Sequence, residues 1–240
     1  MEEKRRRGRP RLDRREVVGS PEEGILQAAA RLFAANGFAG TSTRQIAAEA
    51  GLQGPSIFHY FPSKEDLLRA LADRALVRPL SVLEEILVSG DPPAVALYRV
   101  VRFHVAHMCS QPVDLTPMLQ DAMRLPRDRF EDWYRAMDRY SAGVRGLIEA
   151  GIRSEVFVDT DPALATMSIL GMGNWTIRWF RPDGRLTGAE VADTFARYAL
   201  RSILRYPDEV ELIARQAEAA DVETSAHSDR PTVRPRSSKS

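Results

Sequence analysis

The sequence predicts an all-α protein with a small N-terminal domain and a larger C-terminal one. Apolar side chains recur every three or four residues in the periodic segments, and no useful length of chain alternates apolar and polar residues as a strand does. Helix starts recur too, as a Ser, Thr or Asp followed by Pro or by an acidic or amide residue three positions on. With 240 residues, 44% of them hydrophobic, the chain can build two cores.

Residues 1–19 are predicted to form a basic, disordered arm. Residues 1–15 carry eight Lys or Arg against three acidic residues, although the net charge of the whole chain is only +1. A glycine and a proline keep the R-G-R-P-R stretch extended. Such an arm suits DNA phosphates or a narrow minor groove, and a solvated tail is the alternative. The arginines concerned are Arg7, Arg9 and Arg11.

The first helix is predicted to begin after Ser20, with Pro21 in its first turn and Glu23 closing a capping box. Gly37 is expected to end it. One face of this helix is apolar and consists of Ile25, Leu26, Ala29, Leu32 and Phe33.

Residues 42–61 are predicted to form a helix-turn-helix. Ser42 and Gln45 form a capping box at the first short helix, and Gly51 supplies the left-handed residue at its end. Pro55 suits the first turn of the second helix, which Pro62 stops. Two short helices joined by a tight glycine turn place the second helix in the major groove of double-stranded DNA. The chain is therefore expected to bind DNA.

The motif T-x-x-x-I-A-x-x-A-G, followed by x-x-x-Y-F-P-S-K-E-x-L, is similar to that of the TetR family of bacterial transcriptional regulators. The similarity spans residues 21–71 and implies a DNA-binding domain over residues 20–66. A palindromic operator requires two such heads, which implies a homodimer. Gly54-Pro55 departs from the Lys-Gly that is frequent in similar sequences, and this puts one backbone or base contact of the family in doubt.

Position and chemistry assign the DNA-contacting residues of this domain. The start of the first short helix favours a phosphate through its backbone N–H groups and dipole. The leading end of the second short helix meets base edges, and the residues after it suit phosphate oxygens. A three-helix unit that binds nothing is the alternative. The candidates are Thr43, Arg44, Gln53, Gly54, Pro55, Ser56, His59, Tyr60 and Lys64.

Residues 67–214 are predicted to form a helical domain for effector binding and dimerisation. The helix that begins after Ser63 continues into it, with a kink or break near Pro79, so no flexible linker separates the domains. Residues 215–240 are polar and are predicted to form a disordered tail. The other segments with helical periodicity cover residues 97–108, 114–125, 130–151, 162–180 and 187–204.

Residues 171–193 resemble the branch of the family that controls fatty-acid or steroid breakdown and often senses acyl-CoA esters. In that branch the last two helices pair with their copies across a two-fold axis. Small residues, Gly171 and Gly173, permit close approach of helices, and aromatic side chains bury large areas. The interface candidates are Gly171, Trp175, Trp179, Phe195 and Tyr198. As the alternative, the aromatic side chains fill the core of one subunit.

An elongated apolar pocket is expected in the larger domain, under the segment between Pro112 and Pro126. Its methionines and apolar side chains suit a small apolar effector, for which an acyl-CoA is one candidate. The lining candidates are Phe103, His104, Met108, Met118, Met123, Trp133, Met137, Met167 and Leu170, with ordinary core packing as the alternative for each. Three arginines, Arg99, Arg102 and Arg178, are available for an anionic head group.

Other protein classes are disfavoured. The chain shows no run of eighteen apolar residues and no signal peptide, and it has a single cysteine, Cys109, which together indicate a cytoplasmic protein. His104 and His107 lack partners in a metal-ligand pattern, so no metal or cofactor is expected. Nucleotide-binding and hydrolase motifs are absent, so no enzyme is expected.

These features predict a dimeric DNA-binding transcriptional regulator, a repressor that a small apolar effector releases from its operator. One alternative is an architectural or effector-independent DNA-binding protein. Another is a regulator of an efflux gene that responds to lipophilic drugs. A third is a small-molecule-binding enzyme with an incidental helix-turn-helix.

Overall fold

The computed structural model describes residues 20–110 and 127–228. Their regular elements are helices, and these ranges hold no strand, only an isolated bridge between Phe157 and Leu204. The all-α prediction is therefore confirmed. Several predictions fall outside the described residues, namely those for the arm with Arg7, Arg9 and Arg11, for the segment between Pro112 and Pro126 with Met118 and Met123, and for residues 229–240.

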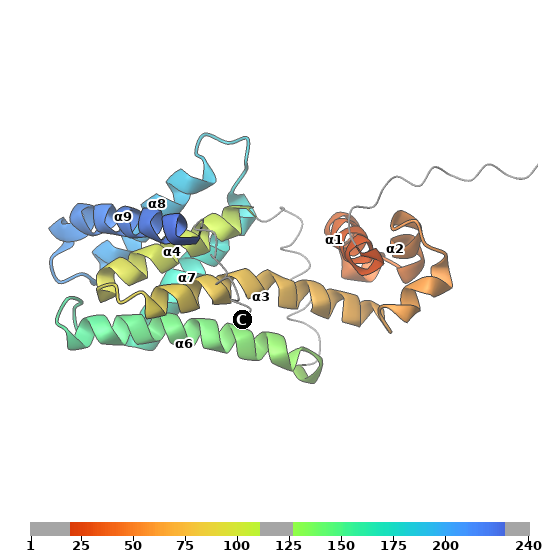
Figure 1. The fold of residues 1–240 in the computed structure, drawn as a ribbon, viewed down its shortest axis with the longest axis horizontal. Helices are drawn as coiled ribbons and strands as arrows, with labels where there is room; N and C mark the ends of the chain where they lie inside the picture. Colours follow the sequence, from red (N-terminus) through yellow and green to blue (C-terminus); the bar gives the residue numbers. More distant parts are fainter. Residues whose placement is uncertain (1–19, 111–126, 229–240) are drawn as a thin grey trace, which may run out of the picture.

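The N-terminal domain consists of α1 (Pro21–Gly40), α2 (Thr43–Glu49), the 3-10 helix η1 (Gly54–His59) and the first half of α3 (Lys64–Val88). Figure 1 shows α1 and α2 at one end of α3, apart from the other helices. Gly37 has a φ of 73°, which interrupts the helical backbone inside α1. The chain kinks there and continues to Gly40, whereas the sequence predicted that the helix ends at this glycine.

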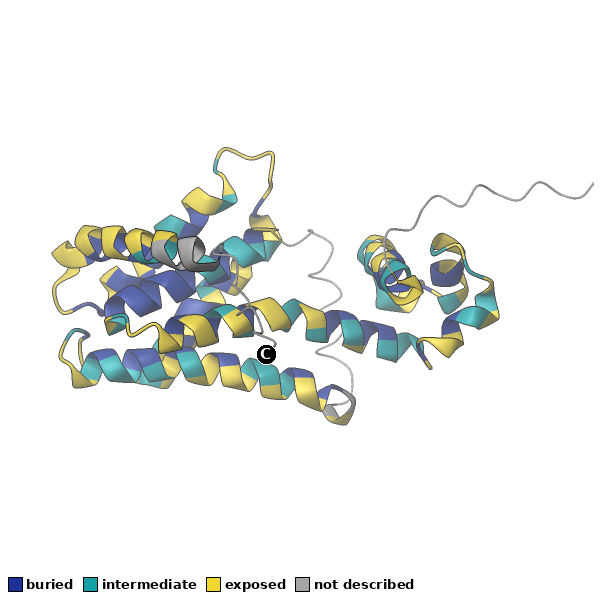
Figure 2. Cartoon of the chain, viewed as in Figure 1, coloured by how far each residue is buried: buried dark blue, intermediate teal, exposed yellow. Residues whose placement is uncertain are grey.

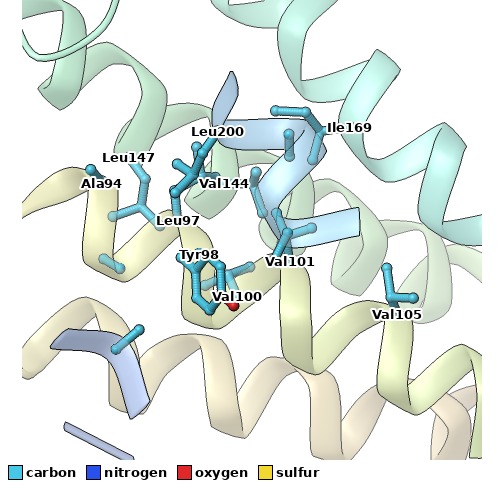
Figure 3. Close-up of a cluster of buried hydrophobic side chains, with 14 of the residues drawn as sticks. Ala94, Leu97, Tyr98, Val100, Val101, Val105, Val144, Leu147, Ile169 and Leu200 are labelled. Atoms are coloured by element: carbon cyan, nitrogen blue, oxygen red, sulfur yellow. The ribbon is translucent and has the colours of Figure 1, made fainter. Parts of the chain in front are cut away.

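The larger domain is built around α4 (Pro93–Ser110). This helix contacts α3, α6 (Glu131–Arg153), α7 (Pro162–Trp179), α8 (Gly188–Ile203) and α9 (Val210–Ser228). Two 3-10 helices, η2 (Arg127–Phe130) and η3 (Pro207–Glu209), precede α6 and α9. Figure 3 shows Leu97 and Val101 of α4 among apolar side chains from the surrounding helices. Buried residues gather where these helices face one another (Figure 2).

One continuous helix, α3, belongs to both domains. Leu67 and Leu68 lie in the N-terminal core, whereas Leu83 and Ile86 lie in the core of the larger domain. Pro79 lies inside α3, and the helix continues through it to Val88 although a kink or break was expected there. A helix of 25 residues spans roughly 37 Å at 1.5 Å per residue. The absence of a flexible linker is thus confirmed between these two cores.

The start of α6 makes a second connection between the domains. Phe130 and Trp133 are buried in the same cluster as Phe33 and Leu71 of the N-terminal domain. Farther along α6, Tyr140 and Val144 belong to the other cluster. Two helices, α3 and α6, therefore pack into both cores and lie alongside each other (Figure 1).

The predicted disordered tail is wrong for residues 215–228, which form most of α9. Ala214 and Ala217 are buried against the larger core. Asp221 accepts hydrogen bonds from Arg99 and Arg102 of α4, at 2.7 and 3.1 Å. The prediction considered only large apolar side chains, but alanines permit close helix packing and a carboxylate paired with two guanidinium groups is held in place.

Candidate nucleic-acid interface and effector domain

The first short helix, α2, is positioned by the caps that the sequence predicted. The Gln45 backbone N–H donates to Ser42 Oγ, and the Ser42 N–H donates to Gln45 Oε1 at 2.8 Å. Ile46 and Ala47 are fully buried in the N-terminal core, so the opposite face of α2 is presented outward. Arg44 lies on that exposed face, and Thr43 is half-buried in the first turn.

The second short helix is η1, and it is a 3-10 helix. Gly51, with a φ of 72°, makes the turn before it, and the Leu52 N–H donates to the Ala47 carbonyl at 2.8 Å. Pro55 lies at the start of η1 and Pro62 follows soon after its end, so the helix is short and keeps the tighter i→i+3 hydrogen bonds. Ile57 is fully buried and holds η1 against the core.

The residues predicted to contact DNA lie mostly at the surface of α2 and η1. Tyr60, one of these candidates, is 43% exposed, and Phe58, which was not among them, is 52% exposed, although both are large aromatic residues. An exposed aromatic side chain at this short helix suits contact with a nucleic acid better than it suits water. The other exposed candidates are Arg44, Gln53, Pro55 and His59, while Thr43, Gly54 and Ser56 are half-buried.

Lys64, predicted to contact a phosphate, makes contacts inside its own domain, and the phosphate contact stays a prediction. Its Nζ donates to the Phe38 carbonyl at 2.7 Å and to the Thr41 carbonyl at 2.9 Å, and it lies 4.3 Å from the centroid of the Phe38 ring. The ammonium group therefore caps the C-terminal end of α1. Sequence reasoning missed this contact because the two carbonyls lie more than twenty residues before Lys64 in the chain.

His104 lies at the centre of the larger domain, with α6 on one side and α7 on the other. It is buried, its Nε2 is 3.1 Å from Asn174 Oδ1, and its ring stacks on that of Tyr140 with centroids 5.7 Å apart. A Cβ atom on Gly173 would come within 2.6 Å of this ring, so glycine makes room for it. Burial lowers the pKa of His104 to about 4, so the imidazole is neutral at pH 7.

A cavity in the described part of the larger domain shares one residue with the predicted pocket lining. This cavity of about 300 Å³ lies between α3, α4, α8 and α9, and Phe103 is the one pocket candidate among its lining residues. Its polar wall contains Arg99, which pairs with Asp91 and Asp221, and Arg102, which pairs with Asp221. Side chains of α8 and α9 cover this side of α4, and the prediction had not included α9. The full lining is Val82, Glu85, Ile86, Arg99, Arg102, Phe103, Ala106, Ala189, Ala192 and Asp221.

The other described pocket candidates are distributed over several environments. Trp133 and Met137 pack on the core of the N-terminal domain. His104 and Leu170 are buried in the core of the larger domain, and Met108 is half-buried. Met167 is 71% exposed on α7, so its prediction as a lining residue of a pocket inside the subunit is wrong. Some apolar residues of α7 face solvent and others face the core, and the sequence of this helix did not distinguish the two sets.

The predicted interface residues form an exposed aromatic surface on α7 and α8. Trp175, Trp179 and Tyr198 are 61%, 43% and 54% exposed. Phe195 is half-buried between the Trp179 and Tyr198 rings, at centroid distances of 6.1 and 6.4 Å. Gly171 is exposed with open space beside it, whereas Gly173 packs on His104 inside the subunit. The alternative in which these aromatic side chains fill the core of one subunit does not describe Trp175 or Tyr198.

Two features are absent from the described ranges. No group of three or more His, Cys, Asp or Glu side chains there is arranged to hold a metal ion. Nor does any helix among those residues combine the length and the apolar character that crossing a membrane requires.

A helix-turn-helix domain joined by a continuous helix to a larger helical domain defines a two-domain DNA-binding regulator. The family model described as "Bacterial regulatory proteins, tetR family" matches residues 25–71. A second model, "Tetracyclin repressor-like, C-terminal domain", matches residues 90–203. The chain belongs to the TetR family of bacterial transcriptional regulators, whose N-terminal domain binds DNA.

Similar proteins cover most of the chain. KstR2 of Rhodococcus jostii, a transcriptional repressor, is 29% identical over 75% of this chain and 87% of its own length. EthR of Mycolicibacterium smegmatis, a transcriptional regulator, is 30% identical over 71% of this chain and 76% of its own. The crystal structure of the TetR regulator PfmR from Thermus thermophilus matches with a TM-score of 0.68 and 33% identity, over 74% of this chain and 97% of that one.

Proposed function

We propose that the protein is a homodimeric repressor whose affinity for a palindromic operator falls when a small apolar effector binds the larger domain. The arrangement of α3 supports this proposal most directly. Its first half packs in the core that positions α2 and η1, and its second half packs against α4. A displacement of α4 is therefore transmitted to the DNA-binding surface without a flexible segment between them.

The exposed aromatic surface on α7 and α8 supports a dimer. Water-exposed Trp175, Trp179 and Tyr198 cost hydration free energy that a second copy would remove. A two-fold axis through this surface would bring each residue against the same region of the partner. Two DNA-binding domains would then be held at one spacing, and half-sites on one face of DNA lie about 34–36 Å apart.

The chemistry of the effector is inferred from the core and from relatives. Apolar side chains from the surrounding helices pack against α4, which suits an apolar ligand. KstR2 of Mycobacterium tuberculosis, 25% identical with a TM-score of 0.64, is described as a ketosteroid transcriptional regulator. A structure of AibR contains isovaleryl coenzyme A and operator DNA. An acyl-CoA is one candidate here, and its anionic part would lie near Arg102, which is half-buried at the cavity and paired with Asp221.

The proposal is tested on the full-length protein with an operator selected from a library of random duplexes. Operator affinity is measured by fluorescence anisotropy, first alone and then with isovaleryl-CoA, palmitoyl-CoA or a lipophilic drug. We expect one class to weaken binding, because a ligand shifts the two conformations only by its differential affinity for them. If operator affinity is the same with either acyl-CoA as without any ligand, the acyl-CoA candidate is contradicted. Release by the drug alone favours an efflux regulator, and insensitivity to every ligand favours an effector-independent DNA-binding protein.

A further inference from the structure

Two buried polar atoms of the described chain lack a hydrogen-bond partner, Trp133 Nε1 and the Tyr140 hydroxyl. Both side chains are buried, at 4% and 6% exposure. A buried N–H or O–H group that bonds to nothing costs free energy, so such groups are rare and each requires an explanation. A phenylalanine at position 140 would fill the same apolar space without this cost.

The two atoms lie on one face of α6. Seven residues separate Trp133 from Tyr140, which is close to two helical turns, so the two side chains leave the helix in nearly the same direction. Their Cα atoms are separated by roughly 10 Å along the helix axis. Trp133 packs with the N-terminal core and Tyr140 with the core of the larger domain, and Met137 between them is apolar. The face thus has a polar group at each end and a hydrocarbon middle.

Neighbouring side chains do not satisfy the Tyr140 hydroxyl. The His104 ring stacks on Tyr140, but its hydrogen-bond partners are Asn174 Oδ1 and the Leu170 backbone carbonyl. Tyr98 provides a contrast inside the same domain, since its hydroxyl donates to Asp193 and accepts from Arg197. The hydroxyl of Tyr140 is therefore exceptional among the buried tyrosines of the larger core.

The donors are neutral, which restricts the ligand they would suit. A carboxylate or phosphate in this position would lose its hydration and gain only neutral donors from these two side chains. A carbonyl oxygen of a ketone, ester or amide accepts a hydrogen bond and loses far less hydration. Apolar Met137 between the donors suits an apolar body.

We propose that Tyr140 and Trp133 determine effector specificity by donating hydrogen bonds to two carbonyl oxygens at opposite ends of a neutral, elongated, apolar molecule lying along α6. This inference rests on the proposed function, since it names the ligand class of the same effector domain. Such a ligand contacts both cores at once, and binding it changes the packing of the helix that connects them.

The probe is androst-4-ene-3,17-dione, whose two ketones lie at opposite ends of a rigid apolar body. Wild type, Tyr140→Phe, Trp133→Phe and the control Tyr98→Phe are compared as full-length proteins. Melting temperatures are recorded with and without the dione, because a ligand of the native state raises this temperature. Dissociation constants are measured by tryptophan fluorescence for the tyrosine variants and by calorimetry for all four proteins.

Without the dione, we expect Tyr140→Phe to melt at or above the wild-type temperature, and Tyr98→Phe to melt below it because a paired hydroxyl is lost. With the dione, we expect binding to weaken about three- to tenfold in Tyr140→Phe and in Trp133→Phe, and to stay at the wild-type value in Tyr98→Phe. Melting of Tyr140→Phe below wild type overturns the proposal, since the hydroxyl then already has a partner such as a buried water.

Equal affinity of wild type and Tyr140→Phe for the dione also overturns the proposal. So does a wild-type protein that fails to bind the dione. The proposed function is judged separately by release of the operator with any other ligand. Failure of the carbonyl assignment is therefore distinguishable from failure of effector control.

Discussion

The His107 side chain of α4 donates a hydrogen bond to the carbonyl oxygen of Ala75 in α3. In an uninterrupted α-helix this oxygen accepts from the N–H of the residue four positions on, which is Pro79 and has none. His107 thus replaces the missing donor at the point where α3 passes from one core to the other. Its ring also stacks on Phe103, with centroids 5.8 Å apart.

Restoring the backbone donor should make this histidine dispensable. We expect His107→Phe to lower the free energy of unfolding by about 1–3 kcal/mol, because the Ala75 carbonyl loses its partner. In a Pro79→Ala background, the same change should cost less, since the backbone N–H of the introduced alanine reaches that carbonyl. Urea unfolding of wild type, the two single variants and the double variant gives the coupling free energy between positions 79 and 107. Additive effects would show that the two positions do not serve the same carbonyl.

Acid should destabilise the larger domain through His104. Burial lowers its folded-state pKa to about 4, against 6.5 for the ordinary side chain. The unfolded chain therefore binds this proton first, and stability falls as pH decreases from about 6.5 to about 4. This difference between the folded-state and unfolded-state pKa values corresponds to a loss of roughly 3 kcal/mol in the free energy of unfolding at about pH 4.

The check is urea unfolding of wild type and His104→Phe between pH 7 and pH 4. We expect a shallower loss of stability in the variant, even though it is less stable at pH 7 without its Asn174 contact. His59→Gln is the matched control, because His59 is exposed and should keep the wild-type profile. Identical slopes for wild type and His104→Phe would mean that His104 does not titrate as inferred.

Two basic residues of the DNA-binding domain should differ in what they contribute. Lys64→Met removes the ammonium that bonds the Phe38 and Thr41 carbonyls, so we expect a loss of about 1 kcal/mol of stability and little change in the salt dependence of DNA binding. Arg44 is exposed on α2, and Arg44→Ala should leave stability unchanged but reduce the salt slope by about one unit if it binds a phosphate. Fluorescence anisotropy over a range of salt concentrations, with a thermal melt of each variant, separates the two effects.

The oligomeric state should depend on the aromatic surface. Trp175→Arg combined with Tyr198→Arg places two charges on it, and we expect the dimer to dissociate because each charge would lose hydration at the interface. Val88→Arg is the control, since Val88 is also an exposed apolar residue but lies at the end of α3. Sedimentation velocity should give a monomer for the double variant and a dimer for the control. A double variant that stays dimeric would place the interface elsewhere.

Local signals in the sequence anticipated much of the N-terminal domain. The cap at Ser42, the turn at Gly51 and the stop at Pro62 act on backbone groups a few residues away, so their consequences are visible in the sequence. There the sequence predicted a second short helix but did not specify its 3-10 type. In the larger domain, periodicity predicted the helices but not every inward-facing apolar side chain, as the exposed Met167 shows.

The amino-acid sequence by itself determined the all-α fold class, the helix-turn-helix and the family, because helix caps, glycine turns and apolar periodicity are short-range properties. Tertiary structure alone decided what joins distant segments. Lys64 caps α1, Asp221 pairs α9 with α4, and His107 completes the α3 backbone at Pro79. Each contact connects residues far apart in sequence, and its free energy depends on a burial and a geometry that exist only once the helices have packed.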